Sequence, residues 1–242
     1  MSGRIVRLLA LALCLTAADL SAQTLPLPEN LTDLDSEQGE KFFFESGALQ
    51  AYFPIAENFV TQKTQAYCGV ASIVMVLNAL HAPAPLSAEY QPYHTFTQDN
   101  VLDEHTDAIL PREVLARQGM TLDQLGALLA LHSAAIEVHH AAEGGLDDFR
   151  AAARDYLAER DHFVIVNYLR KAIGQEIGGH ISPLAAYDAK ADRFLILDVA
   201  RYKYPPVWVK ASDLFDAMNT MDAANGNRTR GYVLVAKAGA AQ

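Results

Sequence analysis

The sequence predicts one α+β domain in which a helical lobe precedes a lobe built on an antiparallel sheet. Three observations indicate this order. Residues 68–80 and 121–129 carry apolar side chains at helical spacing, whereas several short apolar runs after residue 162 have the length of buried strands. The chain has 242 residues, of which 51% are hydrophobic and 20% charged, a composition suited to one large domain with an ordinary core.

The first expected element is a short helix near residues 36–46, within a stretch that is otherwise rich in loops. The second covers residues 68–80, from Cys68 to Leu80. This segment is apolar on nearly all sides, which is typical of a central buried helix. Pro83 and Pro85 lie just beyond it and prevent its continuation.

Three further helices complete the predicted N-terminal half. Residues 112–118 form the first of them. Thr121 and Gln124 then have the spacing of a capping box, and the leucines that follow lie on one side of the helix it opens. Residues 146–160 have the pattern of an amphipathic helix.

The second half changes from helical spacing to short apolar runs. We expect strands at residues 163–169, 181–187, 194–199 and 232–235. Residues 188–192 have the composition of a turn, so the second and third strands are expected to form a hairpin. Strands joined by short turns pair in antiparallel fashion, which predicts an antiparallel sheet.

The first 22 residues have the pattern of a signal peptide. Arg4 and Arg7 precede the apolar stretch Leu8–Thr16, and small residues close the segment. The apolar stretch is shorter than the ~20 residues that cross a bilayer. We therefore expect cleavage, no stable membrane insertion, and a periplasmic or secreted protein whose single functional domain covers residues 23–242.

Charge and cysteine content narrow the function. The formal net charge of −10 argues against a nucleic-acid partner, because such proteins need a basic surface to neutralise phosphates. Of the two cysteines, Cys14 lies in the predicted leader, which leaves Cys68 alone in an oxidising compartment. A lone thiol there is either functional or a buried side chain that packs as a small hydrophobic group.

Cys68, His180 and Asp198 are the candidate catalytic residues. Cys68 begins the predicted buried helix, where the backbone N–H groups and the helix dipole favour a nucleophilic thiolate. His180 follows two glycines at the start of a strand and can act as a general base. Asp198 ends an apolar run, so its carboxylate needs a partner. The predicted hairpin brings Asp198 beside His180, as nucleophile, base and orienting group require.

Gln62 is a candidate oxyanion donor, because a side-chain amide near the nucleophile can stabilise developing negative charge. Gln65 shows that a loop glutamine also occurs here without an assigned role. The order of cysteine, histidine and aspartate suits papain-like enzymes, although the local papain signature around Cys68 is absent. His139 and His140 are adjacent, so their side chains diverge on a regular element and predict no metal site.

Three segments resemble the catalytic domain of phytochelatin synthases: Phe59–Leu80, which contains Gln-Ala-Tyr-Cys-Gly-Val-Ala, Gly178–Tyr187 and Leu197–Val209. The resemblance covers roughly residues 45–236. It implies a papain-like fold and a cysteine acyltransferase that acts on glutathione. The enzyme's cysteine takes the γ-glutamylcysteinyl group, glycine is released, and the group passes to water or to a second glutathione.

The resemblance also assigns roles to individual residues. An acidic residue and an arginine of the family hold the amine and carboxylate of the γ-glutamyl group, which points to Asp222 and Arg230. The spacing between these two is one residue longer than expected, so Arg228 competes with Arg230 for the second role. The nucleophile, base, orienting group and oxyanion donor are, in this order, Cys68, His180, Asp198 and Gln62.

The resemblance is to short, single-domain bacterial-type members of the family, which implies mainly glutathione hydrolysis with weaker phytochelatin synthesis. No cofactor is required. Heavy-metal ions such as cadmium are expected to act through glutathione thiolates, in a role in metal detoxification. A homodimer is left open. Two other functions also remain open: a papain-like peptidase for other small peptides, and a non-catalytic periplasmic glutathione-binding protein.

Overall fold

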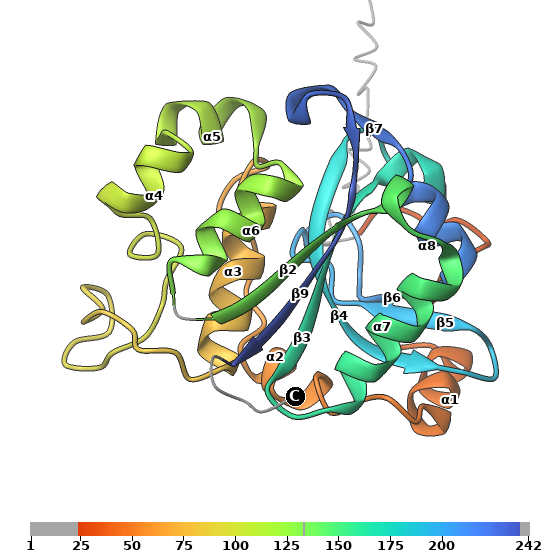
Figure 1. Cartoon of the computed structure of the whole chain (residues 1–242). Coiled ribbons are helices and arrows are strands. Elements are labelled where there is room, and N and C mark those ends of the chain that lie inside the picture. Colours follow the sequence, from red (N-terminus) through yellow and green to blue (C-terminus); the bar gives the residue numbers. More distant parts are fainter. Residues whose placement is uncertain (1–23, 133, 238–242) are drawn as a thin grey trace, which may run out of the picture.

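A single antiparallel sheet of seven strands, in the order β1-β6-β5-β4-β3-β9-β2, runs through the molecule (Figure 1). The structure is a computed structural model that describes residues 24–132 and 134–237. The predicted leader and Cys14 therefore lie outside the described residues. The strands are β1 (Thr32–Asp33), β2 (Ala134–His140), β3 (His162–Leu169), β4 (Gly179–Asp188), β5 (Arg193–Ile196), β6 (Val207–Lys210) and β9 (Gly231–Lys237).

A second, two-stranded sheet is formed by β7 (Met221–Asp222) and β8 (Arg228–Thr229). The α-helices are α1 (Glu37–Glu45), α2 (Tyr52–Glu57), α3 (Cys68–Ala79), α4 (Glu104–Ile109), α5 (Arg112–Gln118), α6 (Leu122–Ala130), α7 (Leu146–Ala158) and α8 (Ala211–Met218). Short 3-10 turns are η1 (Ala141–Glu143), η2 (Arg170–Ile173) and η3 (Ala223–Asn225).

Local sequence signals account for the helix boundaries. Ser36 caps α1 by accepting a hydrogen bond from the amide of Gly39 at 3.0 Å. Thr121 and Gln124 form the predicted capping box of α6, with reciprocal bonds of 3.2 and 3.0 Å. All but one of the residues of α3 are buried, as its all-round apolar sequence predicts.

The core lies on both faces of the sheet. In Figure 1, α3 and α6 lie on the left of the sheet, and α7 and α8 lie on its right. Strand β4 contacts α3 of the first group and α7 of the second, β3 contacts α7 and α8, and both strands are buried at nearly every position. Apolar runs without alternation are the pattern expected when both faces of a strand are covered.

The combination of helices and an antiparallel sheet is confirmed, but the elements are less segregated than predicted. The first half of the chain also supplies β1 and β2, at the two edges of the sheet, and α7 packs on the sheet itself. The second half contains the helix α8. Strand β5 ends at Ile196, three residues before the predicted end. The amide of Leu197 still bonds the carbonyl of Pro183 on β4, and the chain then turns at Asp198, whose carboxylate accepts a hydrogen bond from the amide of Ala200.

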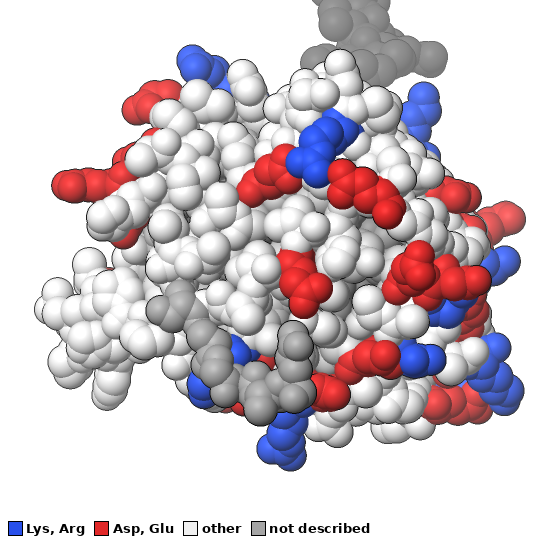
Figure 2. Space-filling model, in the orientation of Figure 1, with Lys and Arg blue, Asp and Glu red and all other residues white. Residues whose placement is uncertain are grey.

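The surface is acidic over much of the face seen in Figure 2. A group of acidic side chains lies over α7, where Asp147, Asp148 and Asp155 are exposed. No helix within residues 24–132 and 134–237 combines the length and the apolar character that crossing a membrane requires.

Candidate active site

Cys68 is the first residue of α3 and lines a cleft that residues of α5 and β4 also line. Cys68 is 7% exposed, so its thiol is reachable from the cleft but mostly shielded from water. The N-cap residue, Tyr67, makes no side-chain capping bond, and no acceptor within the described residues pairs with the amide of Cys68. The start of α3 is thus open to a negatively charged atom.

The environment of Cys68 favours its ionised form. Burial alone opposes ionisation of the thiol. The neighbouring His180 and the backbone N–H groups of Ile181 and Gly69 outweigh burial, so the pKa of the thiol lies below its ordinary value. This agrees with the sequence-based expectation of a thiolate at the start of the helix.

His180 and Asp198 meet as the hairpin predicts. His180 is the second residue of β4, and Asp198 lies two residues beyond the end of β5, its partner strand. The Nε2 atom of His180 is 2.8 Å from Oδ1 of Asp198 and 2.9 Å from Oγ of Ser182. Since Nε2 is engaged there, Nδ1 is the nitrogen left to exchange a proton with the thiol of Cys68.

Arg170 completes the site and was missed in the sequence analysis. Its guanidinium is buried and places Nη2 2.9 Å from Oδ1 of Asp198 and Nη1 2.8 Å from Oδ2. Only the bond to Oδ1 has good hydrogen-bond geometry. Gln175 accepts from Nη1, and the ring of Tyr204 lies 5.3 Å from the guanidinium carbon. An arginine directly after the mainly apolar strand β3 was the signal, because a buried cation requires a partner.

The charges of this group reinforce one another. Burial disfavours the charged forms of both His180 and Asp198. Their mutual attraction outweighs it, so the pKa of His180 is raised and the pKa of Asp198 is held well below its usual range. Arg170 also lowers the pKa of Asp198. Asp198 is therefore an anion at neutral pH, able to orient His180 and to stabilise its imidazolium form.

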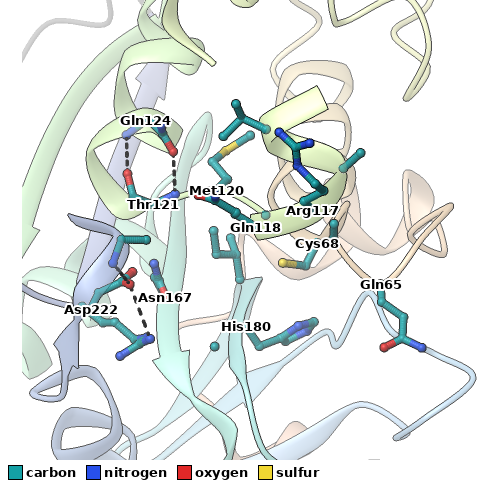
Figure 3. Close-up of a pocket in the computed structure, with 18 of the residues that line it drawn as sticks. Gln65, Cys68, Arg117, Gln118, Met120, Thr121, Gln124, Asn167, His180 and Asp222 are labelled. Atoms are coloured by element: carbon teal, nitrogen blue, oxygen red, sulfur yellow. Dashed lines mark hydrogen bonds and ion pairs between the residues drawn. The ribbon is translucent and has the colours of Figure 1, made fainter. Parts of the chain in front are cut away.

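Gln62 is close in sequence but not aimed into the cleft. Its side chain is buried, and Nε2 donates to the carbonyl of Thr64 at 2.7 Å and to the hydroxyl of Tyr202 at 3.1 Å. Gln65, by contrast, lines the rim of the cleft and extends away from Cys68 (Figure 3). In this conformation, both amide hydrogens of Gln62 are already used, so the predicted oxyanion bond needs one of them to be released.

The cleft has a volume of about 380 Å³ and carries a pair of opposite charges on the wall formed by the C-terminal part of the chain (Figure 3). Nη2 of Arg230 lies 3.7 Å from Oδ1 of Asp222. Nη1 donates to the carbonyl of Met221 at 2.6 Å and to Oγ1 of Thr220 at 3.2 Å. The Nε atom of Arg230 is buried without a partner in the described residues, so it remains available to a ligand.

The structure separates the two arginines that the spacing left in competition. Arg230 lines the cleft, whereas Arg228 is exposed outside it and pairs with Asp123 and Glu143, each at 2.9 Å. Gly179 explains why Arg230 fits: a β-carbon at this glycine would lie 3.3 Å from the guanidinium. Gly178 has φ +117°, a conformation that favours glycine.

Asn167 is a second residue that the sequence analysis missed. It lies on β3, directly opposite Ile181 on β4 and Gly231 on β9. Its side chain is almost fully buried and lines the cleft. A polar residue in the middle of an apolar strand was the available signal, since its amide must find a partner.

The two adjacent histidines diverge as expected. His140 is buried, with Nδ1 on the carbonyl of Thr229 and Nε2 2.9 Å from Asp123, while His139 stacks on Tyr232. No cluster of three or more metal-ligating side chains occurs in the part of the chain that the structure describes.

The chain is similar to known proteins over most of its length. A family model described as phytochelatin synthase matches residues 22–232. The chain is 36% identical over 226 residues to glutathione gamma-glutamylcysteinyltransferase 3 of Lotus japonicus, a match that covers 92% of this chain and 46% of the relative. It is 33% identical over 223 residues to glutathione gamma-glutamylcysteinyltransferase 1 of Arabidopsis thaliana, covering 91% and 44%.

A fungal relative, glutathione gamma-glutamylcysteinyltransferase of Schizosaccharomyces pombe, is 28% identical over 214 residues, covering 86% of this chain and 50% of the relative. The chain thus spans about half the length of the curated relatives it matches. Since the family model covers residues 22–232 and the plant relatives exceed 30% identity, the chain belongs to the phytochelatin synthase family.

Proposed function

We propose that the protein transfers the γ-glutamylcysteinyl group of glutathione, through a thioester on Cys68, to water or to a second glutathione. The observation that carries this proposal is the placement of two groups on one cleft. Cys68 and His180 line one wall of the cleft, and the buried carboxylate of Asp198 bonds His180. The Asp222–Arg230 pair lines another wall. The names of the relatives support the same substrate and reaction.

In the first half of the reaction, Nδ1 of His180 takes up the proton of the Cys68 thiol, which becomes a thiolate. The thiolate attacks the carbonyl carbon between the cysteinyl and glycyl residues of glutathione. His180 then donates its proton to the glycine nitrogen, the C–N bond breaks, and glycine leaves. Asp198 stabilises the imidazolium until that proton is transferred to glycine, because its charge faces Nε2.

In the second half, water or the amine of another glutathione attacks the thioester carbonyl. His180 takes a proton from the attacking group, and the thiolate of Cys68 leaves. Water yields γ-glutamylcysteine, whereas the amine yields a peptide with one more γ-glutamylcysteinyl unit. The chain's own residues are sufficient for both outcomes, so we propose no cofactor. Cadmium would act by binding the thiolates of the substrate.

The γ-glutamyl end of the substrate is an amino acid with one charge of each sign. Asp222 would hold its ammonium group, and the free Nε of Arg230 would donate to its carboxylate. The amide of Asn167, on β3, would complete these contacts with the peptide. This end of the cleft therefore fits an unblocked γ-glutamyl group.

The arrangement around Cys68 supports a papain-like mechanism. A cysteine at the start of a buried helix faces a histidine on a strand of an antiparallel sheet, and a carboxylate orients the histidine. The amide of Cys68 would donate to the developing oxyanion. Gln62 would be the second donor once its bond to Tyr202 is exchanged for one to the substrate.

Export is a separate part of the proposal, carried by the signal-peptide pattern of the first 22 residues. Fractionation of cells that produce the full chain tests it. A processed protein outside the cytoplasm is expected, and a version without residues 1–22 should stay inside. Retention of the full-length chain in the cytoplasm would contradict export.

One incubation tests the activity. The purified protein is mixed with glutathione, with and without cadmium, and the products are identified by mass spectrometry. We expect release of glycine, a γ-glutamylcysteinyl adduct on Cys68, and γ-glutamylcysteine or longer peptides. Cleavage of ordinary dipeptides with no action on glutathione would identify a peptidase instead. Tight binding of glutathione with no adduct would identify a binding protein.

A further inference from the structure

We propose that Arg117 binds the carboxylate of the C-terminal glycine of glutathione and so makes a free C-terminus a condition for efficient attack by Cys68. This inference rests on the proposed function. Arg117 lies in the last turn of α5 and lines the cleft on a different wall from Asp222 (Figure 3). It thereby gives the cleft a second cationic side chain.

The turn that carries Arg117 stands directly beside the nucleophile. Met120, three residues further on, packs so closely on α3 that a β-carbon at Gly69 would lie 2.8 Å from its sulfur. Gly119 has φ +74°, and its would-be β-carbon lies 3.6 Å from the carbonyl of Ala66. Ala66 and Gly69 flank Cys68, so this turn contacts the chain on both sides of the reacting thiol.

The charges on the cleft match those of glutathione. At neutral pH the tripeptide carries two carboxylates and one ammonium group. Among the described residues that line the cleft, Asp222 is the one carboxylate, Arg117 and Arg230 are the two arginines, and there is no lysine. The Asp222–Arg230 pair accounts for the γ-glutamyl amino acid, which leaves the glycine carboxylate for Arg117.

Arg117 is also uncommitted. Within the described residues no carboxylate lies within 4.0 Å of it, whereas Arg112 pairs with Asp107 at 3.0 Å and Arg228 with Asp123 at 2.9 Å. Arg160 and Arg201 are likewise exposed without an ion pair in the described residues, but neither lines the cleft. Arginine recognises a carboxylate through two parallel N–H donors, so an unpaired guanidinium on the wall of a cleft is suited to this ligand.

The geometry of the substrate fixes which end faces Arg117. The glycine carboxylate is separated from the attacked carbonyl by a single residue, which spans at most about 3.6 Å. It must therefore lie close to Cys68, on a wall that contacts the start of α3. The turn at residues 117–120 meets this requirement. The γ-glutamyl group lies on the other side of the scissile bond, toward Asp222.

A contact with glycine acts on the first half of the reaction alone, because glycine has left before the thioester is cleaved. Arg117 should therefore affect formation of the acyl-enzyme and not its breakdown. A residue that bound the second glutathione would show the opposite pattern. This difference separates the donor site proposed here from an acceptor site.

The test compares glutathione with its C-terminal amide, which lacks the glycine carboxylate. Initial rates of glycine or glycinamide release give kcat/KM for each peptide. We expect the wild-type protein to favour glutathione by about tenfold, the lower range for a charge-assisted hydrogen bond. Arg117→Ala should lose this preference by reacting more slowly with glutathione, with the rate on the amide changed by less than about twofold. Arg117→Lys should restore part of it.

Arg154→Gln is the matched control. Arg154 is an exposed arginine on α7, paired only with its neighbour Asp155, and it does not line the cleft. The substitution Arg154→Gln removes one positive charge, as Arg117→Ala does, and should leave the preference for glutathione over its amide unchanged. An unchanged preference in Arg117→Ala overturns the proposal. A loss confined to transfer onto a second glutathione, with glycine release intact, overturns it as well.

A binding measurement keeps the test independent of turnover. Titration calorimetry with Cys68→Ala, alone and combined with Arg117→Ala, compares the affinities for the two peptides. The amide should bind about tenfold more weakly than glutathione only when Arg117 is present. If glutathione binds to Cys68→Ala with this preference but the wild-type protein releases no glycine, the proposed function fails while the contact stands. Equal affinities overturn the contact.

Discussion

Arg170 and Asp198 form a buried ion pair behind His180, with Nη2 of the arginine 2.9 Å from the carboxylate oxygen that also faces the histidine. Both side chains are almost completely shielded from water. The same oxygen accepts a bond from the amide of Ala200 at 2.8 Å. Three donors therefore converge on one atom, which fixes the carboxylate and, through it, the plane of the imidazole.

The pH dependence of activity should change when Asp198 is replaced by asparagine. The reactive form pairs a thiolate with an imidazolium, so activity rises as Cys68 ionises and falls as His180 loses its proton. Asp198 raises the pKa of His180. In Asp198→Asn, the alkaline limb of the kcat/KM profile should move to lower pH, while more activity remains than in His180→Ala because the amide can still accept the Nε2–H bond. Rates of glycine release across a pH series measure both effects.

His180→Ala is the comparison for this experiment, because it removes the base and not merely its orienting group. It should be nearly inactive at every pH. If Asp198→Asn keeps the wild-type alkaline limb, or if it is as inactive as His180→Ala, the assigned role of Asp198 is wrong.

Arg170→Met should destabilise the protein. Removing one partner of a buried ion pair costs about 3–5 kcal/mol. Arg170 holds down the pKa of Asp198, whose contribution to stability is present above the unfolded-state pKa and is lost as pH falls through the folded-state pKa. Without the arginine that folded-state pKa rises, so loss of stability on acidification should begin at higher pH. Denaturant unfolding at several pH values tests this.

Arg193→Met is a control for the loss of a partly buried arginine outside the site, since its guanidinium bonds only backbone carbonyls, those of Asn30 and Trp208. It should leave the shape of the acid limb unchanged. A variant Arg170→Met with wild-type stability would show that the buried pair is not a stabilising contact.

The proximity of the candidate catalytic residues could be predicted from the sequence because their signals are local. Cys68 opens an apolar helix, and His180 and Asp198 lie on two strands joined by a short turn, so one hairpin brings them together. Arg170 could not be placed in this way. Its contact with Asp198 depends on the pairing of β3 with β4 and on burial from both faces. The residues that neighbour Arg170 in the sequence predict neither of these.

Elements outside the centre of the sheet were harder to predict. Strand β2 mixes apolar and polar side chains because it lies at an edge, and β6, which lies between β1 and β5, is only four residues long. Helix α8 is short and carries two aspartates. The hydrogen bonds of Gln62 were also beyond prediction, since Tyr202 is 140 residues away in sequence.

Cys68→Ser should abolish glycine release and adduct formation while leaving the fold intact. The hydroxyl has nearly the size of the thiol, but it does not ionise at neutral pH, so it is a far weaker nucleophile. Loss of the nucleophile of a triad can lower kcat by about a million-fold. Mass spectrometry after incubation with glutathione reports the adduct, and an unchanged thermal transition reports the fold. Wild-type turnover in this variant would rule out the proposed mechanism.

Arg230→Gln and Arg228→Gln should have different effects on KM. Arg230 faces the cleft with a free Nε, so its loss should raise KM for glutathione by about tenfold or more, the range expected for a hydrogen bond to a charged group. Arg228 bonds Asp123 and Glu143 on the exposed side of the β7–β8 hairpin. Its replacement should change KM by only a few-fold. Steady-state kinetics on the two variants decide between them, and the reverse order would reassign the site to Arg228.

The balance between hydrolysis and peptide synthesis should depend on the concentration of glutathione. The cleft volume of about 380 Å³ is near the lower end for small-molecule sites, which suits one tripeptide better than two. Water is the solvent and needs no binding site of its own, whereas a second glutathione must be positioned before its amine can attack. Glycine and γ-glutamylcysteine should dominate at low glutathione, and longer peptides should accumulate only near millimolar levels, the upper part of the usual KM range.

Cadmium should raise synthesis only by binding substrate thiolates, so S-methylglutathione should show no cadmium response. Chromatography of products over a glutathione series measures the balance. Dominant synthesis at micromolar glutathione would reveal a well-formed acceptor site and contradict this account of the cleft.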